Sequence, residues 1–223
     1  MMKKQVLGIK VDDVTIDEAV GLVGEWLNGK VKHYVVTPNP EIVMMAQKDA
    51  ELKKIINNAD LAIPDGNGLK LGTDIVCNTP GIDVMEDLIK MASEKGFTTG
   101  FLGGRDQVAK KTAERLQKKY KNLKVSFVSE EPGKIPDTDI LFVAFGAPKQ
   151  EYWIADNLDK IPVKVAMVVG GSFDYISGVV PRAPKLIRSL GFEWLFRLIT
   201  QPWRIKRQLA IIKYVLLLIY DNH

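Results

Sequence analysis

Short runs of apolar, often β-branched residues alternate along most of the chain with longer stretches in which apolar positions recur every three or four residues. The first pattern predicts strands and the second predicts amphipathic helices. The predicted strands are 33–37, 61–63, 99–102, 125–128, 140–145 and 163–169, and the predicted helices are 41–57, 83–95, 106–120 and 149–158. This alternation predicts an α/β fold with a Rossmann-like, mostly parallel sheet and helices on both of its faces.

The alternation stops near residues 181–184, and from Leu186 to Tyr220 the pattern is helical, apolar and basic. Pro202 divides this stretch into at least two helices, because proline interrupts helical hydrogen bonding. We therefore predict a core of residues 1–184 and a helical appendage of residues 185–223. Aromatic and aliphatic side chains beside basic ones are typical of a helix at a membrane surface. The same helices are equally suited to closing the core or an oligomer interface.

Positive charge is concentrated at the C-terminal end of the chain. The net charge of +4 is modest, and charged residues make up an ordinary 26% of the 223 residues. From residue 182 onward the basic residues are Arg182, Lys185, Arg188, Arg197, Arg204, Lys206, Arg207 and Lys213, against only Glu193 and Asp221. This imbalance indicates an anionic partner, a membrane or a phosphate. Nucleic acid is disfavoured, because the aromatic residues are interleaved with aliphatic ones.

A single cysteine, Cys77, excludes an internal disulfide and is typical of a reducing compartment. The first residues include two lysines but no apolar run long enough for a signal peptide. The chain nowhere reaches the roughly 18 consecutive apolar residues of a membrane-spanning helix. These features predict a cytoplasmic protein that binds a membrane without crossing it.

Polar residues follow the predicted strands, at the edge of a parallel sheet where ligands bind. Asp65 stands in a Pro-Asp-Gly sequence after one strand. Its carboxylate can accept a proton from a substrate hydroxyl, or it can simply form a turn. Thr37 and Asn39 follow the preceding strand. They can bind a sugar or a phosphate, or cap the next helix.

Glycine-rich turns follow three other strands and place further groups at the same edge. Backbone N–H groups of such turns can bind phosphate at the start of a helix. The candidate substrate-binding residues in and after these turns are Gly103, Gly104, Lys149, Gln150, Ser172 and Asp174. The lone Gly-Gly pair is a weak indication, because neither a dinucleotide fingerprint nor a P-loop is present.

No metal site is predicted. The sequence Asp137-Thr-Asp139 is similar to the Asp-x-Asp of metal-dependent glycosyltransferases, but it precedes a strand and therefore belongs to the opposite edge of the sheet. His33 has no partner at a metal-binding spacing, and Cys77 has no identifiable base beside it. Structural roles are expected for both.

A series of motifs follows in order along nearly the whole chain. They are Thr37-Pro-Asn39, Glu41-Ile-Val-Met-Met-Ala46, Pro64-Asp-Gly66, Gly81-Ile-Asp83, Phe145-Gly-Ala-Pro-Lys-Gln-Glu151, Gly170-Gly-Ser-Phe-Asp174, Arg182-Ala-Pro184, Gly191-Phe-Glu-Trp-Leu-Phe-Arg197 and Pro202-Trp-Arg204 with Arg207. In combination they resemble the WecG/TagA/CpsF family of bacterial glycosyltransferases.

The resemblance implies an inverting transfer that needs no metal or other cofactor. Family members move N-acetylmannosamine, or another sugar, from UDP to undecaprenyl-diphosphate-linked N-acetylglucosamine in the synthesis of wall teichoic acid or other surface polysaccharides. It implies that Asp65 is the base, that Thr37 positions the acceptor and that Gln150 belongs to the site. The residues implied to reach the diphosphate are Arg197, Arg204 and Arg207.

The implied partners are a UDP-sugar, a polyprenyl-diphosphate-linked acceptor and an anionic membrane surface, here the inner face of a bacterial cell membrane. A homo-oligomer is left open. Two departures from the family pattern favour an alternative, a non-catalytic module that binds a nucleotide-sugar or a lipid. Asn78 stands where the family usually has an arginine, and the segment between Asp65 and Gly81 is short. A nicotinamide-dependent oxidoreductase is disfavoured, because no Gly-x-Gly-x-x-Gly follows the first strand.

Overall fold

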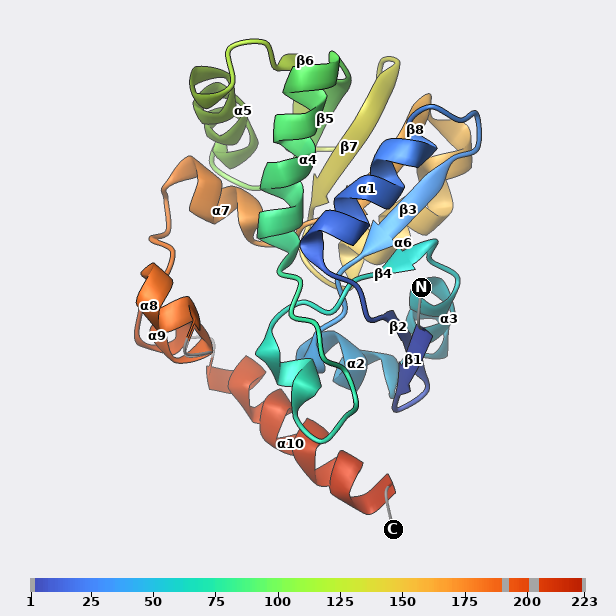
Figure 1. Ribbon diagram of the computed structural model, residues 1–223, viewed down its shortest axis with the longest axis vertical. Helices are drawn as coiled ribbons and strands as arrows, with labels where there is room; N and C mark the ends of the chain where they lie inside the picture. Colours follow the sequence, from blue (N-terminus) through green and yellow to red (C-terminus); the bar gives the residue numbers. More distant parts are fainter. Residues whose placement is uncertain (1–2, 190–192, 201–204, 222–223) are drawn as a thin grey trace.

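The computed structural model describes residues 3–189, 193–200 and 205–221, and their centre is a six-stranded parallel sheet (Figure 1). Its strand order is β4-β3-β8-β7-β5-β6. The strands are β3 (His33–Val36), β4 (Leu61–Ala62), β5 (Thr98–Gly103), β6 (Lys124–Ser129), β7 (Thr138–Ala144) and β8 (Val163–Val168). All neighbouring strands pair in parallel. The predicted α/β fold class is therefore confirmed.

Helices cover both faces of the sheet, because side chains alternate along each strand. In β7, Phe142 faces one apolar layer, and Leu141 and Val143 face the other. The first layer contains α1 (Ile16–Trp26), α4 (Gly81–Lys95), α5 (Val108–Lys119) and α7 (Ser172–Ser177). The second contains α2 (Pro40–Ala46), α3 (Ala50–Asn57) and α6 (Lys149–Asn157). Right-handed crossovers that run in opposite directions along the sheet place their helices on opposite faces.

The N-terminal hairpin and the first helix were not assigned from the sequence pattern. β1 (Lys3–Val6) and β2 (Ile9–Asp12) pair antiparallel. Leu7 and Gly8 between them both have positive φ, 48° and 76°, as a tight turn that matches strand twist requires. Strands this short carry little periodicity. The hairpin instead packs its apolar residues against the layer that contains α2 and α3.

The predicted helix 41–57 is wrong in one respect, because the structure divides it into α2 and α3. Asp49 caps α3, since its carboxylate accepts a hydrogen bond from the N–H of Leu52 at 3.0 Å. An aspartate that captures a backbone N–H in this way competes with a continuous helix. Two short 3₁₀ helices, η1 (Asn67–Lys70) and η2 (Leu158–Lys160), complete the connections.

The C-terminal stretch forms α8 (Lys185–Ser189), α9 (Glu193–Thr200) and α10 (Ile205–Asp221), which lie towards the carboxyl end of the sheet (Figure 1). α10 packs on α2. Tyr214 is fully buried there, with its hydroxyl 3.4 Å from the carbonyl oxygen of Leu69. Within the described ranges no helix is both long and apolar enough to cross a membrane. The domain boundary after residue 184 stays a prediction.

Candidate functional site at the carboxyl edge of the sheet

The segments that follow β3 and β4 continue to form backbone hydrogen bonds with each other. The N–H of Ile63 donates to the carbonyl oxygen of Val36, and the N–H of Asp65 donates to that of Pro38, both at 3.0 Å. The adjacent strand ends therefore bring Thr37 and Asp65 to the same edge of the sheet. Gly66 has φ of 86°, so the Pro-Asp-Gly sequence is also the turn that its composition allows.

The carboxylate of Asp65 is held at the N-terminus of α4. Its Oδ1 accepts a hydrogen bond from the N–H of Gly81, the first residue of that helix, at 3.0 Å. Thr37 is buried against the same glycine, because a Cβ added to Gly81 would lie 3.0 Å from Cγ2 of Thr37. The half-buried carboxylate of Asp65 thus has a fixed orientation at the edge where ligands bind in such sheets.

Asn39 performs the second of the two roles expected of it. It is the N-cap of α2, and its side-chain oxygen accepts a hydrogen bond from the N–H of Ile42 at 3.1 Å. This contact orients the start of α2 beside the end of β3. A contact between Asn39 and a substrate stays a prediction.

Gln150 connects two of the glycine-rich turns. Its Oε1 accepts hydrogen bonds from the N–H of Gly146 at 3.2 Å and from the N–H of Gly170 at 3.1 Å. Its Nε2 donates to Oε1 of Glu151 at 3.0 Å. Both side chains are almost completely buried, with exposed fractions of 2% and 1%. Burial raises the pKa of Glu151, because a charged carboxylate is costly away from water.

The backbone conformation at positions 103 and 104 requires glycine. Their φ values are 101° and 75°, and a Cβ on Gly103 would lie 2.7 Å from the carbonyl carbon of Ala144. The N–H of Gly104 donates to the carbonyl oxygen of Ala144 at 3.0 Å. Gly103 is the last residue of β5 and Gly104 follows it. β5 lies four strand positions from β4, which corresponds to about 19 Å. These glycines lie at the same edge as Asp65 but not beside it.

The other predicted binding residues lie in the first turns of α6 and α7, the helices that follow β7 and β8. Lys149 is exposed, and its Nζ lies 5.0 Å from the ring centroid of Phe145. Ser172 is buried and donates to the carbonyl oxygen of Val169 at 2.7 Å. Asp174 is half-buried in α7. Strand topology places all three at the edge that carries Asp65.

The arginines assigned to the diphosphate lie at the limits of what the structure describes. Arg197 falls in α9 and Arg207 in α10, but their side chains are outside the described part of the chain. Arg204 lies entirely outside the described residues. Their role stays a prediction.

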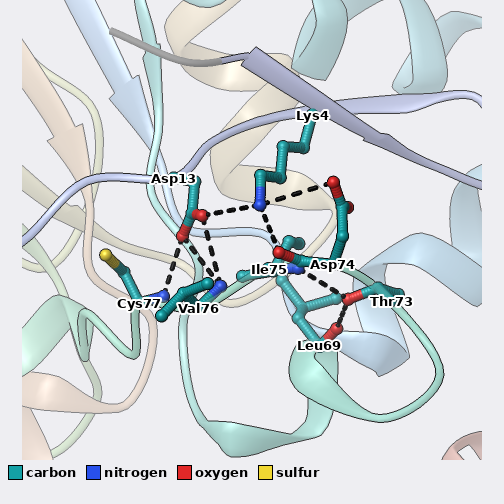
Figure 2. Close-up of polar contacts among 8 residues, drawn as sticks. All are labelled: Lys4, Asp13, Leu69, Thr73, Asp74, Ile75, Val76 and Cys77. Atoms are coloured by element: carbon teal, nitrogen blue, oxygen red, sulfur yellow. Dashed lines mark hydrogen bonds and ion pairs between the residues drawn. The ribbon is translucent and has the colours of Figure 1, made fainter.

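The short segment after Asp65 is anchored by the N-terminal part of the chain, as Figure 2 shows. The carboxylate of Asp13 accepts hydrogen bonds from the N–H groups of Val76, at 3.2 Å, and Cys77, at 2.8 Å, and lies 3.1 Å from Nζ of Lys4. Burial of Asp13 opposes ionisation, but these hydrogen bonds outweigh it and lower its pKa to about 2. The sequence pattern gives no indication of this role for Asp13, because only the fold brings Asp13 to this segment.

The Asp-x-Asp sequence lies at the opposite edge, as its position before a strand predicts. Oδ2 of Asp139 accepts hydrogen bonds from the N–H and the hydroxyl of Thr98, at 2.8 and 3.0 Å, and Oδ1 lies 2.8 Å from Nζ of Lys164. This carboxylate joins the amino ends of β5, β7 and β8. Its contacts are structural.

Two cavities, of about 340 and 370 Å³, lie along α1 and α4. The first is lined by Thr15, Ile16, Asp17, Cys77, Asn78 and Asp87. Neither contains a predicted catalytic or binding residue. Asn78, the departure from the family pattern, lines the first cavity, and its buried side-chain oxygen has no hydrogen-bond partner among the described residues.

Comparison with known proteins shows a similarity over most of the chain. The model of the glycosyl transferase WecG/TagA/CpsF family matches residues 4–222. Two similar proteins are the N-acetylglucosaminyldiphosphoundecaprenol N-acetyl-beta-D-mannosaminyltransferases of Bacillus subtilis (strain 168) and Bacillus spizizenii (strain ATCC 23059 / NRRL B-14472 / W23). Each is 32% identical to this chain. The alignment with the first relative covers 88% of this chain and 83% of that protein. The alignment with the second covers 82% of this chain and 77% of that protein.

Proposed function

Because the chain belongs to the WecG/TagA/CpsF family of glycosyltransferases, we propose that it transfers N-acetylmannosamine from UDP to undecaprenyl-diphosphate-linked N-acetylglucosamine. The relatives at 32% identity are named for transfer of this sugar to this acceptor. The proposed step belongs to the synthesis of wall teichoic acid or another cell-surface polysaccharide.

The observation that carries the proposal is the position of Asp65. Its carboxylate is fixed by the N–H of Gly81 at the carboxyl edge of the sheet, beside Thr37. In the proposed single displacement, Asp65 accepts the proton of the acceptor hydroxyl while the hydroxyl oxygen bonds to the anomeric carbon of the donor. The bond from that carbon to UDP breaks, and its electron pair leaves with the terminal phosphate. Attack from the face opposite UDP inverts the configuration.

Positive charge near the edge favours departure of the diphosphate. The exposed Lys149 lies in the first turn of α6, and the N-termini of the helices direct backbone N–H groups towards the same edge. The C-terminal arginines, which the family resemblance assigns to the diphosphate, would complete this neutralisation. The mechanism therefore assigns no step to a metal ion.

The C-terminal helices are proposed to bind the inner face of a bacterial cell membrane. Ile212, Leu216, Ile219 and Tyr220 recur at helical spacing along α10 and are all exposed. Leu195 and Ile199 are exposed one turn apart in α9. Apolar side chains on a basic helix insert into the interface of an anionic membrane. Because these helices lie towards the carboxyl edge of the sheet, a membrane there would present a lipid-linked acceptor to Asp65 (Figure 1).

The test is a transfer assay with the full-length protein, a panel of UDP-sugars and a short-chain diphosphate-linked N-acetylglucosamine. We expect transfer from UDP-N-acetylmannosamine, and a loss of about 10²–10⁴-fold in turnover for Asp65→Asn, because the amide cannot accept the proton. Wild-type turnover in the Asp65→Asn variant would exclude Asp65 as the base. Binding of the UDP-sugar without turnover by the wild-type protein would favour a non-catalytic module instead.

A further inference from the structure

An ion pair joins the first turn of α4 to the segment that leads into the C-terminal helices. Both carboxylate oxygens of Asp83 accept hydrogen bonds from Arg182, one from Nη1 at 2.6 Å and one from Nη2 at 2.8 Å. Exposure is limited to 27% of the Asp83 side chain and 19% of the Arg182 side chain. A two-point contact between a guanidinium and a carboxylate fixes orientation as well as distance.

A neighbouring arginine extends this contact to α8, which packs against α9. Nη1 of Arg188 in α8 lies 3.9 Å from Oδ1 of Asp83, and its Nε donates to the carbonyl oxygen of Ala183 at 3.1 Å. Burial opposes the charge on Arg182. The hydrogen bonds and charge of Asp83, and the charge of Glu193 at the start of α9, outweigh burial and raise the pKa of Arg182. The pair is therefore the centre of a charged cluster that links α4 to α8, and α8 in turn packs against α9.

The same turn of α4 also holds the proposed base. Gly81, whose N–H donates to Asp65, precedes Asp83 by two residues. The first turn of this helix thus has two attachments, one to the carboxylate at the edge of the sheet and one to the C-terminal helices. A shift of the ion pair between Asp83 and Arg182 therefore changes the position of α8 and α9 relative to Asp65.

We propose that Asp83 and Arg182 are positioning residues that fix α8 and α9 relative to Asp65 and so align the lipid-linked acceptor with the base. The inference rests on the proposed function, because it concerns the acceptor of that reaction. Neither residue takes part in the proton transfer. Loss of the pair leaves the donor site intact and reduces the fraction of molecules in which the acceptor hydroxyl lies within reach of Asp65.

The kinetic test compares Arg182→Gln, Arg182→Lys and Asp83→Asn in the full-length protein on liposomes that contain the acceptor. For Arg182→Gln and Asp83→Asn we expect KM for the acceptor to rise by about tenfold or more, while KM for the UDP-sugar changes by less than about twofold. Arg182→Lys should give an intermediate rise, because lysine keeps the charge but loses the two-point contact.

Lys119→Gln is the matched control. Nζ of Lys119 lies 3.1 Å from Oε2 of Glu86, so this ion pair also starts from α4 but leads to α5. Its removal should leave both KM values unchanged. Equal effects of Lys119→Gln and Arg182→Gln, or an equal rise in both KM values for Arg182→Gln, would overturn the proposal.

A second measurement does not depend on activity. Hydrogen exchange should become faster in α8 and α9 of the Arg182→Gln variant and stay unchanged in the six-stranded sheet, which also shows that the variant is folded. Unchanged exchange in α8 and α9 would refute the positioning role. A wild-type protein without transfer activity would refute the proposed function, and exchange would then still decide whether the pair holds these helices in place.

Discussion

At the scale of single residues, a few buried side chains hold the loops around the carboxyl edge in place. Asp13 accepts hydrogen bonds from the backbone after η1, and Gln150 connects the turns that follow β7 and β8. Each supplies acceptors to N–H groups that the strand and helix ladders leave without a partner. Substitutions at these two positions should therefore affect stability more than substitutions of exposed neighbours.

Replacement of Asp13 by asparagine should lower the free energy of unfolding by about 2 kcal/mol at pH 7. The folded pKa of about 2 lies below the ordinary value. The stabilisation is therefore present above about pH 4 and is lost as the pH falls towards 2. Urea unfolding at pH 7 and at pH 3 checks this. Asp74→Asn is the control, because Asp74 faces the same Lys4 at 3.4 Å but is 77% exposed, and it should cost under about 0.5 kcal/mol.

Gln150→Leu should lower the free energy of unfolding by about 2–4 kcal/mol, because two backbone N–H groups lose their acceptor. Urea unfolding measures the loss. Lys149→Leu, at the exposed neighbouring position, should change it by less than about 0.5 kcal/mol. Equal losses in the two variants would show that the bridge between the turns contributes little.

Glu151→Gln should remove a pH dependence of stability. The folded pKa of Glu151 is raised, so the folded state holds its proton more tightly than the unfolded state. The contribution of Glu151 to the free energy of unfolding therefore decreases as the pH rises from the ordinary glutamate pKa, about 4.3, towards the raised pKa of the folded state. The glutamine keeps an oxygen that accepts from Gln150. The wild-type free energy of unfolding should fall relative to this variant as the pH rises above about 4. Parallel pH curves would contradict the prediction.

At the scale of elements, α10 has two apolar faces with different roles. Tyr214 and Leu218 are buried against the core that includes α2, with exposed fractions of 0% and 7%. Ile212 and Leu216 point away from that core, with exposed fractions of 58% and 61%. One face therefore attaches the helix to the protein, and the other is available to a membrane or a second copy of the chain.

Substitutions on the two faces should separate these roles. Tyr214→Ala should lower the free energy of unfolding by about 3–5 kcal/mol, because it removes a large buried side chain. Leu216→Ser should change stability by less than about 0.5 kcal/mol but weaken binding to anionic liposomes. Urea unfolding and liposome co-sedimentation measure the two effects. A change from dimer to monomer with unchanged liposome binding would assign the exposed face to self-association.

At the scale of the whole molecule, the parallel order of the strands decides which polar groups meet. The predicted site residues lie at or just beyond the carboxyl ends of β3, β4, β5, β7 and β8. Asp139 lies at the amino end of β7, on the opposite edge of the sheet. The Asp-x-Asp sequence is therefore separated from Asp65 by the length of the strands. This separation underlies the proposal of a metal-independent transfer.

Removal of divalent cations should leave the transfer rate unchanged within about twofold, because backbone dipoles and basic side chains are proposed to neutralise the leaving diphosphate. The measurement is transfer with and without an excess of EDTA. The opposite outcome is a loss of activity that magnesium or manganese ions restore.

Sequence periodicity was sufficient to predict the helices and strands that have long apolar patterns. The helices at 83–95, 106–120 and 149–158 and the central strands match the observed α4, α5, α6, β5, β7 and β8 within a few residues. The pattern did not predict where a helix ends at a local hydrogen bond, or where a strand is very short. Asp49 ends one helix and starts another, and the N-terminal hairpin has only four residues in each strand.

The sequence by itself determined the fold class, the family and the placement of Asp65 and Thr37 at one edge, because parallel strands bring their carboxyl ends together whatever the loops between them. Only the tertiary structure decided the contacts that hold this edge and its neighbouring segments in place. Gly81 lies against Asp65, Asp83 binds Arg182 and Asp13 anchors the backbone at Cys77. Such contacts join residues from 16 to 99 positions apart. Local propensity carries no information about them, since packing of the whole chain brings these groups together.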